Sequence, residues 1–133
     1  MYAVLRLIPF AAAAAAVIWL SPAAAAISSE AAEVQLQLAR LLFTDGRYVE
    51  AFNAYEQVKA HDDVRIKREA LMGGVKTALR LGDFSHAHAD AQLLVASAPR
   101  SSDAIAAFAD ALWSVGLFEQ SEKIGRASCR ERV

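Results

Sequence analysis

Apolar residues recur at helical spacing through the middle of the chain. Tyr48, Ala51 and Tyr55 stand at positions i, i+3 and i+7, and Phe52 fills i+4, so all four share one face of a helix. No stretch of the sequence shows the alternation of apolar and polar residues, bounded by turn residues, that predicts a half-buried strand. The pattern therefore predicts an all-α chain, with helices over residues 30–44, 48–60, 65–80, 84–97, 102–114 and from 118 onward.

A short pattern occurs three times within these predicted helices. Gly46, Gly82 and Gly116 are separated by 36 and 34 residues. Each glycine is followed two residues later by an aromatic residue and five residues later by a small one: Tyr48 and Ala51, Phe84 and Ala87, Phe118 and Ser121. Each glycine fits a turn between two helices, because glycine readily adopts the positive φ that ends a helix. A helix pair cannot bury its apolar face alone, so the pairs are expected to stack.

These units resemble the tetratricopeptide (TPR) repeat, a helix pair with a period of 34 residues. The matching positions are Tyr48, Ala51 and Tyr55 in the first unit, Phe84, Ala87 and Pro99 in the second, and Phe118 and Ser121 in the third. The sequence departs from the family where an early Trp is expected, since Gln35, Leu71 and Ile105 stand there. The resemblance implies a TPR-type α-solenoid of stacked antiparallel helix pairs. We expect about three repeats, over about residues 32–65, 68–100 and 102–123, with the last one truncated.

The N-terminal segment has the layout of a secretory signal peptide. One positive charge at Arg6 precedes an apolar run over residues 7–20, and small residues follow up to Ala26. We expect residues 1–26 to be cleaved, which predicts an exported bacterial protein, periplasmic or secreted, with no membrane attachment afterwards. If the segment stays uncleaved, it would instead tether the protein to the membrane.

The last ten residues, Ile124 to Val133, do not continue the repeat pattern. They resemble a translated sequencing adapter, so we expect them to be foreign and the natural protein to continue differently after Lys123. The chain's one cysteine, Cys129, lies in this segment. Residues 27–123, the expected repeat domain, therefore offer neither a disulfide nor a cysteine metal site.

Charge and residue pattern argue against several classes of function. Residues 27–123 hold 10 basic and 14 acidic side chains, which lacks the basic excess that nucleic-acid binding requires. His86 and His88 are two residues apart, so on a helix they point about 200° away from each other and cannot readily share one metal ion. No catalytic residue, metal site or cofactor is predicted, and this fragment is not expected to be an enzyme.

The TPR resemblance also implies a binding surface, because in that family the first helix of each pair lines a concave groove. Arg40 and Lys76 occupy equivalent positions, and Asp110 breaks this basic row in the third repeat. We therefore expect the groove to hold an extended acidic peptide near the first two repeats. Capture of a peptide's C-terminus is not predicted, because the Lys/Asn pattern of carboxylate-clamp adaptors is absent. The candidate groove residues are Leu36, Gln37, Arg40, Phe43, Met72, Lys76, Arg80, Asp110 and Trp113.

The predicted function is a protein-interaction scaffold of the cell envelope that binds a partner protein or peptide in this groove. The alternative is that these repeats form the N-terminal arm of a larger exported enzyme, for example an aspartyl-protease-like hydrolase whose catalytic domain follows.

Overall fold

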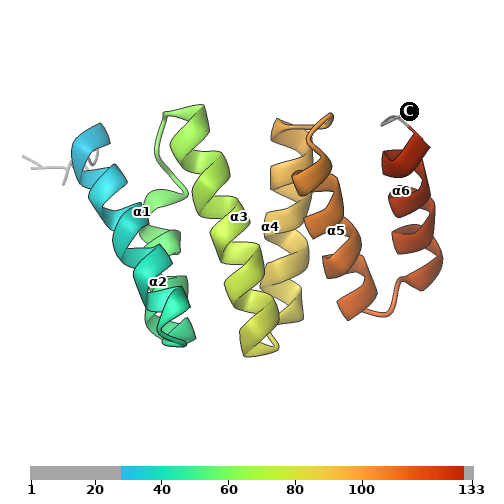
Figure 1. The fold of residues 1–133 in the computed structure, drawn as a ribbon, viewed down its shortest axis with the longest axis horizontal. Coiled ribbons are helices and arrows are strands. Elements are labelled where there is room, and N and C mark those ends of the chain that lie inside the picture. The colour runs from blue at the N-terminus through green and yellow to red at the C-terminus, as the bar shows by residue number, and fades with distance from the viewer. Residues whose placement is uncertain (1–27, 131–133) are drawn as a thin grey trace, which may run out of the picture.

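The computed structural model describes residues 28–130, and these residues form six helices and no strand. The helices form three antiparallel pairs that stack side by side (Figure 1). The predicted helices are confirmed, with ends that differ by at most two residues. The signal-like residues 1–26 lie outside the described part. In chain order the helices are α1 (Ser29–Thr44), α2 (Tyr48–Val58), α3 (Val64–Leu81), α4 (Phe84–Ser97), α5 (Ser102–Ser114) and α6 (Phe118–Arg130).

The three repeated glycines form the turns inside the helix pairs. Gly46, Gly82 and Gly116 have φ angles of 76°, 75° and 82°, in the left-handed region that glycine adopts without a steric penalty. In all three turns the residue after the glycine donates its N–H, at 2.9 Å, to the carbonyl five residues earlier. This bond satisfies a carbonyl that the helix end leaves without a partner. The glycine pattern of the sequence thus sets where the first helix of each pair ends.

Short polar side chains fix where several helices begin. Ser28 accepts a hydrogen bond from the backbone N–H of Ala31, and Ser101 accepts one from the N–H of Ala104. Asp63 accepts from the N–H groups of Arg65 and Ile66 at the start of α3. Each cap satisfies a backbone donor that has no partner within its own helix.

The core runs through the stack and passes across α3. One cluster joins α1, α2 and α3, with Leu36, Tyr55 and Ile66 among its members. A second joins α3, α4 and α5 and includes Leu71 and Leu94. Alanine is frequent in both clusters, which lets the helices approach closely. Because α3 contributes to both clusters, it connects the interior of the first repeat with that of the second repeat and α5.

The first helices of the pairs lie next to one another along one side of the stack. α3 contacts both α1 and α5, whereas no close backbone contacts join the second helices α2, α4 and α6 to one another within residues 28–130. The side built from α1, α3 and α5 is therefore the inner side of the solenoid. Over the same residues, no helix is both long and apolar enough to span a bilayer.

A buried ion pair ties the first repeat to the second on the side of the second helices. Lys59 follows the end of α2, and its Nζ lies 2.8 Å from both carboxylate oxygens of Asp90 in α4. Glu56 contacts the same ammonium group. Burial raises the pKa of the Asp90 carboxyl, although Lys59 opposes this change. The ion pair and the ring contact between Phe52 and His86, whose centroids lie 5.7 Å apart, together join α2 to α4.

Helix α6 continues through Ile124 to Arg130, so the segment expected to be foreign begins inside a helix. The helix does not bear on the origin of these residues, which stays a prediction.

Candidate functional site

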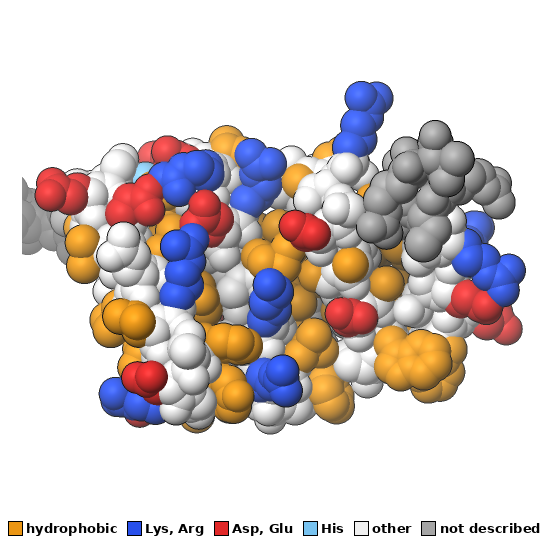
Figure 2. Space-filling view, viewed as in Figure 1, with side chains coloured by type: hydrophobic (Ala, Val, Ile, Leu, Met, Phe, Trp, Pro, Cys, Tyr) orange, Lys and Arg blue, Asp and Glu red, His pale blue; other side chains and the backbone are white. Residues whose placement is uncertain are grey.

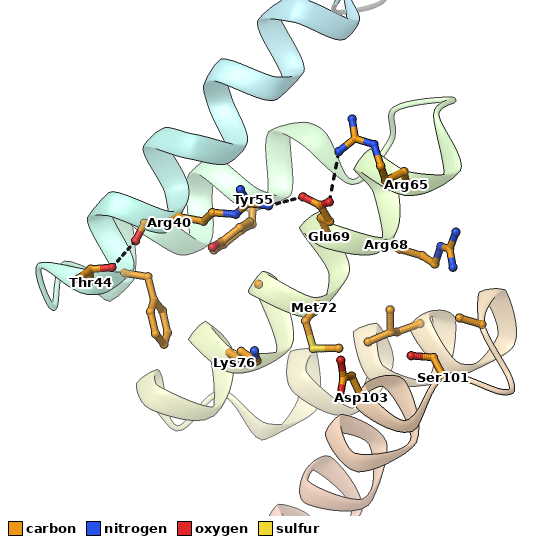
Figure 3. A pocket seen from close by; sticks show the side chains of 14 residues that line it. Arg40, Thr44, Tyr55, Arg65, Arg68, Glu69, Met72, Lys76, Ser101 and Asp103 are labelled. Carbon is orange, nitrogen blue, oxygen red and sulfur yellow. Dashed lines mark hydrogen bonds and ion pairs between the residues drawn. The ribbon is translucent and has the colours of Figure 1, made fainter. Parts of the chain in front are cut away.

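A groove of about 580 Å³ opens on the inner side of the stack (Figure 3). Its wall comes mainly from α1 and α3, and α2, α4 and the start of α5 complete it. Phe43, Tyr55, Met72 and Leu94 supply apolar surface, while four basic and two acidic residues supply charge. The charged lining residues are Arg40, Arg65, Arg68, Lys76, Glu69 and Asp103. The groove thus combines an apolar floor with an excess of positive charge.

Tyr55 and Gly73 form the floor beneath the α1 side of the groove. A Cβ atom on Gly73 would lie 2.2 Å from Cε1 and Cζ of the Tyr55 ring, so the ring rests directly on the backbone of α3. Only 5% of Tyr55 is exposed. Burial raises the pKa of the Tyr55 hydroxyl, while the nearby Arg40 lowers it. A neutral phenol therefore forms this part of the floor at neutral pH.

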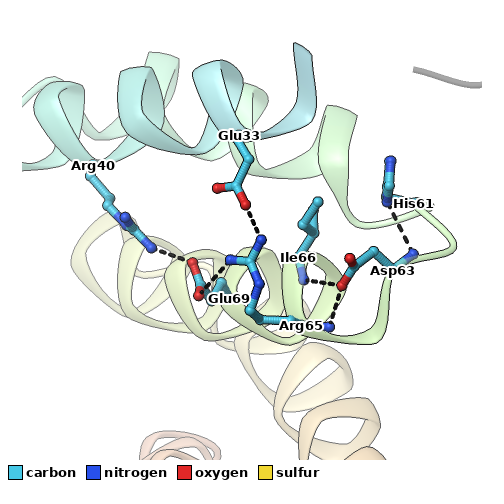
Figure 4. A network of polar contacts seen from close by, with 7 residues as sticks. All are labelled: Glu33, Arg40, His61, Asp63, Arg65, Ile66 and Glu69. Carbon is cyan, nitrogen blue, oxygen red and sulfur yellow. Dashed lines mark hydrogen bonds and ion pairs between the residues drawn. The ribbon is translucent and has the colours of Figure 1, made fainter. Parts of the chain in front are cut away.

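A ladder of ion pairs crosses from α1 to α3 above this floor (Figure 4). Arg65 contacts Glu33 on α1 and, at 3.2 Å, Glu69 on its own helix. Glu69 in turn contacts Arg40 on α1. Because these side chains are one third to one half exposed, the ladder adds little stability, but it holds both arginines in place.

The start of α3 is held by a second set of polar contacts that leads into the ladder. The N–H of Asp63 donates to Nδ1 of His61 at 3.0 Å, and Asp63 caps the helix that begins next to it. These contacts fix the backbone of Arg65, from which the guanidinium reaches Glu33 (Figure 4).

Two cations of the groove remain without an acidic partner. Arg68 donates from Nε to the carbonyl of Val64 at 3.4 Å and makes no ion pair within residues 28–130. Lys76 is exposed and has no ion pair or hydrogen bond in the same region. Their charges are therefore free to meet an anionic group in the groove.

A smaller hollow of about 190 Å³ continues the groove toward α5. Met72, Lys76 and Asp103 line both spaces and lie together in Figure 3. The remaining walls are Val75, Leu79, Ala106, Ala107 and Asp110. The concave surface thus runs from α1 across α3 to α5.

Five of the candidate groove residues line one of the two hollows. Arg40, Phe43, Met72 and Lys76 line the larger groove, and Asp110 lines the smaller hollow. Gln37, Arg80 and Trp113 border neither space. Trp113 instead packs against Phe118 at a ring distance of 4.7 Å, beside the turn between α5 and α6.

The prediction that Leu36 lines the groove is wrong. Leu36 has no exposed surface and belongs to the core shared by α1, α2 and α3. It packs with Ala32 and Ala39 on the face of α1 that turns toward its neighbours, so it cannot contact a ligand.

Several lining residues are absent from the sequence-based set, among them Tyr55, Arg65, Arg68 and Asp103. One pattern in the sequence could have indicated Asp103. Glu33, Glu69 and Asp103 each stand thirteen residues before the turn glycine of their repeat. An acidic residue at the same place in all three repeats marks a row along the first helices.

The fold matches a known architecture. No protein-family model matches the chain, and no curated protein matches it. Among solved structures, the chain is similar to the first TPR domain of Spaghetti (RPAP3), which was determined with the HSP90 peptide SRMEEVD bound. The TM-score is 0.67 and the sequences are 22% identical, over 75% of this chain and 78% of that one. The fold is a TPR-type α-solenoid. The pairs α1–α2, α3–α4 and α5–α6 are its three TPR-type repeats, and the groove lies on their first helices.

Proposed function

We propose that this TPR-type domain is a protein-interaction module that binds an extended acidic peptide segment of a partner protein. The observation that carries the proposal is the pair of free cations, Arg68 and Lys76, beside an apolar floor on the concave side. An acidic side chain in the groove would form charge-assisted hydrogen bonds with them, while apolar side chains of the peptide would cover Phe43 and Met72.

The ion-pair ladder favours a role in positioning for Arg40 and Arg65. Both guanidinium groups already contact carboxylates, so their charge is largely compensated before a ligand arrives. Arg68 and Lys76 are eight residues apart on α3, or about 12 Å along a helix. An extended peptide rises about 3.3 Å per residue, so two acidic groups about three or four residues apart would span them.

The similar domain of RPAP3 was solved with an acidic peptide, which supports peptide binding by a domain of this fold. The mode of capture proposed here differs in one respect. The lysine and asparagine pattern of a carboxylate clamp is absent from this sequence, so acidic side chains within the segment carry the binding. A free peptide C-terminus is therefore not required.

The test is fluorescence anisotropy of the chain with the labelled peptide SRMEEVD in three forms. These are the free acid, the C-terminal amide and a peptide in which both glutamates are glutamine. We expect the acid and the amide to bind with similar affinity, and the glutamine peptide to bind at least about tenfold more weakly. Equal binding of the glutamate and glutamine peptides, or binding of none of the three, would contradict the proposal.

We also propose that the module acts outside the cytoplasm, at the cell envelope. The support is the signal-like sequence of residues 1–26. Mass spectrometry of the N-terminus of the mature protein tests it, and a mature protein that begins at Met1 in the cytosolic fraction would exclude it.

A further inference from the structure

The charge of the inner face reverses between its helices. α3 carries five basic residues and one acidic residue, whereas α5 carries two acidic residues and no basic one. Figure 2 shows Lys and Arg side chains together with acidic ones over α1 and α3, and acidic side chains over α5. A ligand that lies along the groove therefore meets opposite charges at its two ends.

Asp103 lacks the partner that its counterparts have. Glu33 and Glu69 stand at the equivalent position of the first two repeats, and Arg65 contacts both of them. The residue equivalent to Arg65 in the third repeat is Pro99, which carries no charge. Asp103 makes no ion pair within residues 28–130, although it lines both hollows. The row of acidic residues thus ends with a carboxylate that still lacks a cation.

Asp110 places a second carboxylate on the same face. It lies seven residues after Asp103, which is almost two full helical turns, and it borders the same hollow. Asp103 also complements the positive N-terminus of α5, because it lies in the first turn. Asp110 lies near the middle of the helix, where no helix end favours an acidic side chain. It is exposed and has no ion pair in the described residues.

We infer that the groove selects a dipolar peptide, with acidic residues over Arg68 and Lys76, an apolar residue over Met72, and a lysine or arginine against Asp103 and Asp110. This inference rests on the proposed function and narrows the class of ligand. The cation of the peptide supplies to Asp103 what Arg65 supplies to Glu33 and Glu69.

The spacing of the two charges on the peptide follows from the helix packing. α3 and α5 are in contact, and packed helices lie about 8–10 Å apart. An extended chain covers that distance in about three residues. The acidic and basic residues of the ligand are therefore separated by two or three positions, with the apolar residue between them. A peptide that is acidic throughout would place a like charge beside Asp103 and Asp110, which disfavours it.

The experiment compares three labelled peptides by fluorescence anisotropy on the full chain. The dipolar probe is Glu-Ala-Ala-Glu-Leu-Ser-Lys, and in the other two the lysine is replaced by glutamine or by glutamate. All three carry capped ends. We expect the lysine peptide to bind about fivefold more tightly than the glutamine peptide, and the glutamate peptide to bind most weakly.

The variant Asp103→Asn/Asp110→Asn should remove the preference for the lysine peptide over the glutamine peptide. Asp110→Asn alone, which leaves the capped start of α5 intact, should remove part of the preference. Asp62→Asn, a charge removal in the loop before α3 and away from the groove, is the matched control and should keep the preference. If the wild type binds the lysine and glutamine peptides equally, the dipolar inference is overturned while acidic-peptide binding stands. If it binds none of the three peptides, the proposed function fails as well.

Discussion

The ring of Tyr55 in α2 rests on the backbone of Gly73 in α3, with no room for a side chain between them. A Cβ at Gly73 would lie 2.2 Å from the ring, far inside van der Waals contact. This contact lets α2 and α3 pack closely at the point where they form the groove floor. It also explains a glycine in the interior of a helix, where glycine is otherwise unfavourable.

Gly73→Ala is expected to destabilise the protein. Alanine gains up to about 1 kcal/mol in helix propensity, but displacing the Tyr55 ring costs more, so we expect a net loss of about 1–2 kcal/mol in the free energy of unfolding. Urea denaturation followed by circular dichroism measures it. Gly125→Ala is the matched control, because Gly125 also lies within a helix and a Cβ there meets nothing within 4 Å. The control should gain stability, and the explanation is wrong if both variants do.

Removing one partner of the buried ion pair should cost more than removing both. Lys59→Met leaves the carboxylate of Asp90 buried without its cation, and we expect a loss of about 3 kcal/mol in the free energy of unfolding. The variant Lys59→Met/Asp90→Leu fills the same space with apolar atoms and should recover most of that loss. Chemical denaturation of both variants measures the difference. A double variant less stable than Lys59→Met would mean that the pair itself, and not the stranded charge, dominates.

The same pair predicts a loss of stability at alkaline pH. Burial alone lowers the pKa of Lys59, but its bonds to Asp90 and Glu56 outweigh burial and raise that pKa above the usual 10.5. Asp90 responds differently, since burial raises its pKa despite the pairing. The prediction rests on Lys59 because its Nζ contacts two carboxylates.

The folded state therefore holds the proton of Lys59 more tightly than the unfolded chain does. This contribution is fully present below pH 10.5 and is lost as the pH rises through the raised pKa. Between about pH 8 and about pH 11.5, the wild type should lose more unfolding free energy than Lys59→Met/Asp90→Leu. Tyr55 is present in both proteins, so its own ionisation cancels in the comparison. Equal losses of unfolding free energy in the two proteins would mean that Lys59 is not the source of the alkaline destabilisation.

Reversing the charges of Arg68 and Lys76 in the groove should weaken the binding of an acidic peptide. We expect Arg68→Glu/Lys76→Glu to reduce the affinity for SRMEEVD at least about tenfold, because the peptide would then meet like charges. Arg80→Glu is the control, since Arg80 is exposed on the same helix but lines neither hollow. Anisotropy titrations at low and high salt measure both. If Arg80→Glu is as damaging as the double change, the net charge of α3 and not the groove governs binding.

The helices could be predicted from the sequence because each turn glycine adopts a positive φ and marks the end of a helix. The burial of side chains was harder to predict, because it depends on what each repeat packs against. In α3 and α5 one face packs on the preceding helix pair, but residues 28–130 contain no pair before α1. Val34 and Leu41, which stand where α3 has the buried Ala70 and Thr77, are therefore 62% and 64% exposed.

A groove position in one repeat does not predict a groove position in the next repeat, because burial depends on what each repeat packs against. Leu36 and Met72 stand ten residues before their turn glycines, yet Leu36 is fully buried and Met72 lines the groove. Tyr55 was missed for a different reason, because it belongs to a second helix and the family pattern draws the groove from first helices. Its place in the floor depends on the missing side chain of Gly73, a contact between residues that the sequence does not link.

The position of α3 links ligand binding to the stability of the first two repeats. This helix supplies Ile66 and Ala70 to one core cluster and Leu71 and Val75 to the other, and it also presents both free cations. Loosening either half of the molecule would therefore disturb the binding charges, even if no groove residue changed. By mass action, a bound ligand would stabilise both halves together by RT ln(1 + [L]/Kd). A saturating peptide should raise the melting temperature of the first two repeats as one unit, so that thermal unfolding doubles as an assay for partners.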